Sequence, residues 1–191
     1  QPAHNILLRF QEAKGLLIPA EGASAFVNQL KPGERFTWQL PLSCSPEAGS
    51  GYIQAAIILE YETDSGLIRT QTDPIVVEVN RPIRLAYDPP QLPAQACEGD
   101  NLAFSMQLMN LGRDEIRNVV LRFDIPGLDC GEPVLVGTIL PGEAETAAAN
   151  LLVSLPDQGA GPVSGTLTLS YEDPLGRKSQ RRHNLTIQLR P

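Results

Sequence analysis

The sequence has little of the material from which catalytic and metal sites are built. Its 191 residues include only two His and three Cys. No Ser, His and Asp stand at a spacing that nominates a triad, and no G-x-S-x-G elbow is present. Asp124, Asp129 and Glu132 gather around one loop but lack the fixed spacing of a calcium loop. We therefore expect a protein that is not an enzyme and that holds neither a metal nor a cofactor.

An excess of positive charge and long apolar runs are missing as well. The formal net charge is −7, whereas a nucleic-acid or anionic-membrane surface needs a cationic stripe that displaces counterions from phosphates. The longest apolar runs, such as 57–59 and 119–121, fall far short of the roughly 18 residues that span a bilayer. No charged start followed by an apolar stretch marks a signal peptide. We expect no nucleic-acid partner and no membrane insertion of this segment.

What the sequence does contain is an internal repeat, which has to be identified before any element is assigned. Four segments recur in the same order, at an offset that drifts only from 113 to 109 or 110: 5–10 with 118–123, 30–34 with 139–143, 57–62 with 167–172, and 75–79 with 185–189. An Arg-Pro pair closes each copy, at 81–82 and at 190–191. The repeat predicts two domains, 1–82 and 83–191.

The two copies are unequal. The first begins at the equivalent of Asn118 and has no counterpart of residues 83–117. We expect the first domain to lack its N-terminal strands, as in a piece of a longer tandem array or a mature protein with a trimmed first module. Missing strands expose apolar faces and unpaired edges, which invite pairing with another chain. The sequence thus predicts a homodimer or strand exchange through residues 1–82.

The spacing of apolar residues predicts strands rather than helices. Leu102, Phe104, Met106 and Leu108 share one parity, and Pro-Gly pairs punctuate the alternating segments. About six or seven short strands per copy are typical of an immunoglobulin-like β-sandwich. The predicted fold is all-β, with two tandem sandwiches.

Two local features refine this prediction. Residues 173–176 and 63–66 read as turns that join the last two strands of each copy into a hairpin. Residues 144–150 have helical propensity, but the aligned Pro-Gly-Glu turns place them opposite the alternating Trp38, Leu40 and Leu42. We expect a strand in both copies.

At this point the residues resemble a known group. The Asn110-x-Gly112 turn, the strand from Asn118 to Phe123, the 140–143 turn and the hairpin at Tyr171 are similar to the bacterial and archaeal Ig-like repeats typified by CARDB and S-layer-associated domains. The resemblance covers the second copy and the last two thirds of the first. It carries no catalytic residues.

The resemblance implies a cell-surface or secreted protein in which several modules form a stalk or an adhesive array. The expected function is that of a non-catalytic spacer, adhesive or protein-interaction module of a larger bacterial protein. Its partner would be a protein or a cell-wall glycan, and its anchor would lie in segments outside this chain. The alternative is an accessory module, carbohydrate-binding or not, of a secreted carbohydrate-active enzyme or peptidase.

The cysteines and histidines receive separate interpretations. Cys97 precedes one expected strand and Cys130 follows the next, and as antiparallel neighbours these strands bring the two ends together, so a disulfide is geometrically possible. Cys44 aligns with Val153 and is expected to be a small buried side chain. His4 and His183 are expected at solvated strand edges.

One basic cluster stands out in this acidic chain. Arg177, Lys178, Arg181 and Arg182 lie on the expected last hairpin of the second copy. They could bind an anionic partner, although charges on an edge strand also serve to block aggregation.

Overall fold

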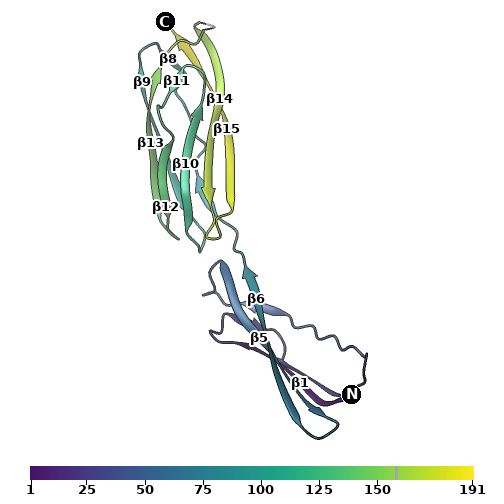
Figure 1. Cartoon of the computed structure of the whole chain (residues 1–191). Coiled ribbons are helices and arrows are strands. Elements are labelled where there is room, and N and C mark those ends of the chain that lie inside the picture. Colours follow the sequence, from purple (N-terminus) through teal and green to yellow (C-terminus); the bar gives the residue numbers. More distant parts are fainter. Residues whose placement is uncertain (158) are drawn as a thin grey trace. The chain divides into compact units, whose positions relative to one another are not determined.

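The computed structural model describes residues 1–157 and 159–191, and these residues form strands without any helix (Figure 1). The predicted all-β class is confirmed. The described residues accordingly contain no helix able to span a bilayer. The chain divides into two compact units, Gln1–Asn80 and Arg81–Pro191, two residues before the boundary that the repeat places after Pro82. Each unit is described by itself.

The second unit is a sandwich of two sheets. One sheet has the order β12-β10-β14-β15-β8 and the other the order β11-β13-β9-β7. All pairs are antiparallel except β15 with β8. The strands are β7 (Leu85–Tyr87), β8 (Gln95–Cys97), β9 (Asn101–Asn110), β10 (Ile116–Asp124), β11 (Leu128–Asp129), β12 (Val134–Ile139), β13 (Ala144–Val153), β14 (Gly161–Glu172) and β15 (Lys178–Arg190).

This strand order is immunoglobulin-like. With β7, β9 and β13 taken as strands A, B and E, and β10, β14 and β15 as strands C, F and G, each set shares one sheet as in that fold. The alternating apolar residues of β9 point inward, and Leu108 has no exposed area. It packs in one cluster with Leu121 and Leu167, which are equally buried. Full burial of such a side chain stabilises the fold by about 1.5–3 kcal/mol.

The first unit repeats part of this arrangement. Its main sheet has the order β3-β1-β5-β6, and a two-stranded ribbon pairs β2 with β4. Under the repeat these correspond to β12-β10-β14-β15 and to β11 with the end of β13. The ribbon even keeps its register, because Leu17 pairs with Cys44 as Leu128 pairs with Val153. The strands are β1 (Ala3–Glu12), β2 (Leu17–Pro19), β3 (Ser24–Leu30), β4 (Leu42–Cys44), β5 (Gly51–Thr63) and β6 (Ile68–Val79).

What the first unit lacks is any equivalent of β7, β8 and β9. Residues 1–80, all of which the structure describes, form no strand in their place. The counterpart of β13 is therefore a strand only at its end, in β4, and residues 35–41 run as an extended trace without strand pairing (Figure 1). The prediction of a strand through Trp38 and Leu40 is wrong, because β13 is held by nine pairs to β9 and the first unit offers no such neighbour.

The expected hairpins are confirmed in both units. The Gly66 N–H donates to Thr63 O over 2.8 Å, and the Gly176 N–H donates to Asp173 O over 2.9 Å. Both glycines have a positive φ, 76° and 79°, which an L side chain rarely adopts. The segment expected to be a strand despite its helical propensity is β13, with Ala147 buried.

Candidate functional site: an open sheet edge in the first unit

Residues 35–44, called the open edge below, have no strand partner over 35–40, and only their end, β4, pairs with a strand, β2, on one side. On that side the Ala20 N–H donates to Pro41 O over 2.9 Å, and the Ser45 N–H donates to Leu16 O over 2.8 Å. The β2–β4 ribbon has just these two strands. The end of the open edge is therefore the border of this ribbon, and residues 35–40 before it have no strand partner on either side.

The free side of the edge carries unpaired ladder groups. In an antiparallel strand the N–H and C=O of one residue point to the same side, and successive residues alternate. Because Pro41 and Ser45 face β2, Leu42 and Cys44 present their N–H and C=O to the opposite side. Pro41, which has no N–H, faces β2, so its missing donor leaves the free side intact.

The second unit shows what normally fills this side. The N–H of Val153, the counterpart of Cys44, donates to Asp100 O over 2.9 Å, and Val153 O accepts from the Gly99 N–H over 3.0 Å. From there β9 continues alongside β13. The open edge thus offers the backbone groups that its repeat uses to hold β9.

The face of the main sheet beneath the edge is incompletely covered. Inner side chains that the second unit buries to 7% exposure or less are only half-buried in the first. The pairs are Leu8 with Leu121, Leu30 with Ile139, Leu59 with Leu169, Tyr61 with Tyr171, Ile75 with Leu185, and Val77 with Ile187. The first unit therefore has an apolar face that its own strands do not cover.

The edge itself is apolar in its middle. Trp38, Leu40 and Leu42 pack against the small buried cluster of the unit and remain half-buried, and Phe36 is 45% exposed. Arg35 is the only charged residue among the ten. These features favour contact with an apolar polypeptide segment rather than with water.

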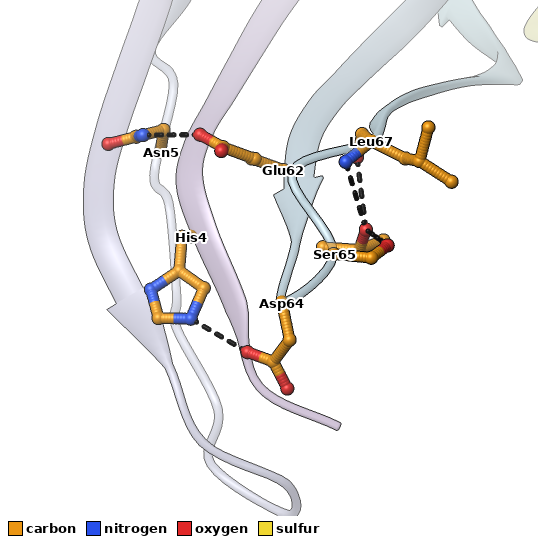
Figure 2. Close-up of polar contacts among 7 residues, drawn as sticks. His4, Asn5, Glu62, Asp64, Ser65 and Leu67 are labelled. Carbon is orange, nitrogen blue, oxygen red and sulfur yellow. Dashed lines mark hydrogen bonds and ion pairs between the residues drawn. The ribbon is translucent and has the colours of Figure 1, made fainter.

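The far ends of the shared strands are alike in both units. Asn5 has a φ of 48° and donates from Nδ2 to Glu62 Oε2 over 2.8 Å, and Figure 2 shows this contact beside that of His4 with Asp64. Asn118 has a φ of 50° and makes the same 2.8 Å contact with Glu172. The two units are therefore alike at this end of their shared strands. They differ in the strands that the first unit lacks.

The structure places no bond between any two of the three cysteines, Cys44, Cys97 and Cys130. β9 and β10 lie in different sheets, so Cys97 and Cys130 do not stand at the ends of neighbouring strands, and the disulfide stays a prediction without that support. Burial, followed by the nearby charge of Asp129, raises the pKa of the Cys130 thiol.

Cys44 is exposed, which corrects the prediction that it is buried. Val153, its counterpart, is 2% exposed. The backbone of Gly99 and Asp100 bonds to Val153 and covers it, and the first unit has no equivalent of that segment. The exposure of Cys44 therefore has the same cause as the open edge.

The basic cluster lies on the β14–β15 turn and on β15, with all four side chains exposed. Arg181 donates from its guanidinium to Leu85 O over 3.5 Å and lies 5.5 Å from the centre of the Tyr87 ring. A side-chain hydrogen bond with Tyr87 raises the pKa of Arg181 further. Lys178 lies 3.9 Å from Glu172. Binding of an anionic partner by Arg177, Lys178, Arg181 and Arg182 stays a prediction.

Both histidines have polar partners. His4 Nε2 lies 3.0 Å from Asp64 Oδ1, and His183 Nε2 lies 2.9 Å from Tyr87 Oη. Asp124, Asp129 and Glu132 line an open depression of about 380 Å³. Within the part of the chain that the structure describes, no three His, Cys, Asp or Glu side chains are arranged to hold a metal ion.

The repeat predicts an incomplete unit at residues 1–82 but does not predict the open edge. The usable signal was the alignment of Trp38, Leu40 and Leu42 with β13. A strand aligned with β13 and deprived of β9 has a free side, and that step requires knowing which strands are neighbours.

Comparison with known proteins identifies no family for this chain. No family model matches the sequence, and no curated protein matches it. Among solved structures the chain is similar to the ASH/PapD-like domain of human CEP192 (PapD-like domain 7), at 13% identity, 61% of this chain, 93% of that chain and a TM-score of 0.41. It is also similar to a protein of unknown function from Porphyromonas gingivalis W83, at 12% identity, 96% of this chain, 85% of that chain and a TM-score of 0.39. These likenesses are too remote to indicate a function, and neither protein's name identifies a CARDB or S-layer-associated domain.

Proposed function

We propose that this chain is a non-catalytic interaction module that binds another polypeptide through its first unit. The observation that carries the proposal is the open edge, where unpaired backbone groups border a half-buried apolar face. In the second unit the same groups are bonded to a strand and the same face is buried.

Strand addition is the form of binding that this surface supports. An extended segment that joins a sheet edge gains main-chain hydrogen bonds, and its alternate side chains enter the pockets of the uncovered face. Proteins usually protect an edge with charges, proline or a covering loop. Among residues 35–44 the single charge stands at one end and the proline faces β2, so the middle of the edge has none of these protections.

The proposed setting is the surface of a cell or a secreted protein, where the module acts as a spacer or adhesive. Its support is the resemblance of the Asn110-x-Gly112 turn and the strands around it to surface repeats. An antibody against the chain should label intact source cells or their medium. Labelling confined to the interior of the cell would contradict this setting and leave polypeptide binding intact.

A selection experiment tests the interaction without assuming a sequence for the partner. A peptide-display library is selected on the full chain, and recovered peptides are mapped by hydrogen–deuterium exchange. We expect binders that slow exchange of amides within Gln1–Asn80. Binders that protect only Arg81–Pro191, or no binders at all, would contradict the proposal.

A further inference from the structure

We infer that the occupant of the open edge is an extended strand of the β9 type, aligned antiparallel to residues 35–44. This inference rests on the proposed function and specifies the partner. Its template lies in the same chain, where β9 pairs antiparallel with β13 from Ala144 opposite Met109 to Leu152 opposite Asn101.

The repeat fixes the register. Leu42 takes the place of Leu151, whose partner is Leu102, and Leu40 takes the place of Ala149, whose partner is Phe104. Trp38 takes the place of Ala147. The occupant therefore carries apolar side chains at alternate positions, which join Trp38, Leu40 and Leu42 on the inner face.

The sizes of these residues specify the occupant further. The edge has Trp and Leu where β13 has Ala147 and Ala149, so the edge itself fills more of the interior. A close-packed interior holds a fixed side-chain volume, and overfilling it destabilises the fold by about 1–3 kcal/mol. The occupant should thus have smaller residues than Phe104 and Met106 at the two corresponding positions.

Charge specifies the two ends of the occupant. Arg35 is exposed at the start of the edge, and Glu47 is exposed beyond its end. In the antiparallel register the C-terminal end of the occupant lies beside Arg35 and its N-terminal end lies toward Glu47. Complementary ends are acidic and basic respectively, with an uncharged middle.

A synthetic peptide built from β9 tests this description. The probe KNLAVSAQLMND keeps the β9 sequence, replaces its Phe and first Met by Val and Ala, and adds a basic and an acidic end. Trp38 is the only Trp of the chain, and the peptide has none. With the full 191-residue chain we expect a saturable shift of Trp38 emission to shorter wavelength and slower amide exchange at residues 36–42.

Matched controls separate this inference from unspecific apolar binding. The charge-reversed peptide DNLAVSAQLMNK should bind several-fold more weakly at low salt, with a difference that shrinks as salt is added. Leu40→Asp, on the inner face, should weaken binding at least tenfold, whereas Gln39→Asp, on the outer face, should leave it unchanged. Both positions lie outside the strands, but Leu40 also packs against the buried cluster, so binding is compared only after circular dichroism shows that both variants retain the fold.

Three results would overturn the inference. The first is no change in Trp38 emission at millimolar peptide, and the second is equal binding by the two variants. The third is a shift of Trp38 emission that depends on chain concentration without peptide, because a second copy would then fill the edge. Selected binders that protect Gln1–Asn80 outside residues 35–44 would contradict this inference alone and leave the proposed function standing.

Discussion

Asn5 donates from its side-chain amide to Glu62 while its own backbone takes a positive φ of 48°. Asn118 repeats both features with Glu172. Each Asn lies where the strand register shifts, between His4 and Leu7 in β1 and between Arg117 and Val120 in β10. Asn tolerates this backbone region better than most residues. The repeated Asn is therefore explained by a strand irregularity that both units share.

Replacing Asn118 separates the backbone effect from the hydrogen bond. Asn118→Ala loses the contact with Glu172 and places a Cβ-bearing residue without a local polar partner at positive φ, which costs about 1–2 kcal/mol. Asn118→Gly loses the contact but adopts the φ freely. In urea unfolding we expect the Ala variant to be less stable than the Gly variant. The reverse order would show that the backbone conformation is not the limiting factor.

The buried hydrogen bonds of the Asn110 side chain give the Asn110-x-Gly112 turn a structural role. It has no exposed area, donates from Nδ2 to Asp114 O and Ile139 O over 2.8 and 2.9 Å, and accepts from the Gly112 N–H over 2.9 Å. We expect Asn110→Ala to lower the free energy of unfolding of the second unit by about 2–4 kcal/mol, because buried groups lose their partners.

Asn101 provides the matched control for that substitution. It lies at the other end of β9 and is exposed, so Asn101→Ala should change stability by no more than about 0.5 kcal/mol. Equal effects of the two substitutions would mean that the buried network at Asn110 contributes little.

The alternation and the repeat were enough to predict the all-β class and the hairpins, because side-chain period and turn chemistry are local properties. Which strands become neighbours in a sheet is not a local property. β9 and β10 follow one another along the chain yet lie in different sheets, since the 111–115 connection passes from one layer of the sandwich to the other. The disulfide predicted between Cys97 and Cys130 therefore has no support from a hairpin of β9 and β10.

The open edge is a second case in which the local pattern does not show which strands are neighbours. The alternating pattern of Trp38, Leu40 and Leu42 is that of a strand, but the ladder that makes a strand requires a partner. Residues 1–80 contain no equivalent of β9, so Trp38 and Leu40 do not form a strand despite their alternation. For the same reason Cys44 is exposed although its counterpart Val153 is buried. The alternation of apolar residues depends on one segment alone and does not show that the neighbouring strand is missing.

The Glu12 carboxylate gives the first unit a pH-sensitive loop. It accepts hydrogen bonds from the N–H groups of Lys14 and Leu16 over 2.8 and 2.7 Å, and the bond from Lys14 contributes most to holding the pKa of Glu12 below its ordinary value of 4.5. A lowered pKa means that these bonds stabilise the loop above that value and are lost as the pH falls through the folded pKa.

An NMR titration checks this sign. The amide shifts of Lys14 and Leu16 should change together, with a midpoint below 4.5, and Glu12→Gln should abolish the transition. A midpoint at or above the ordinary value would show that the loop does not favour the charged carboxylate.

The thiols should differ in reactivity. Cys130 is half-buried and its thiol pKa is raised, which lowers its thiolate fraction, whereas Cys44 and Cys97 are exposed. With iodoacetamide and peptide mass analysis we expect Cys130 to react slowest. Cys130 reacting as fast as Cys97 would contradict this order. Protection of both until a reductant is added would establish the Cys97–Cys130 disulfide instead.

The uncovered face also predicts the order in which the units unfold. The first unit buries fewer side chains completely, so its apolar burial stabilises it less than that of the second unit. Trp38 belongs to the first unit and is the only Trp. Its emission should change at a lower denaturant concentration than the main loss of β-sheet circular dichroism. Asn110→Ala should move the later transition and leave the midpoint of Trp38 in place. A single transition that moves as a whole with this variant would mean that the two units unfold together. The first unit would then not be the less stable of two independent units.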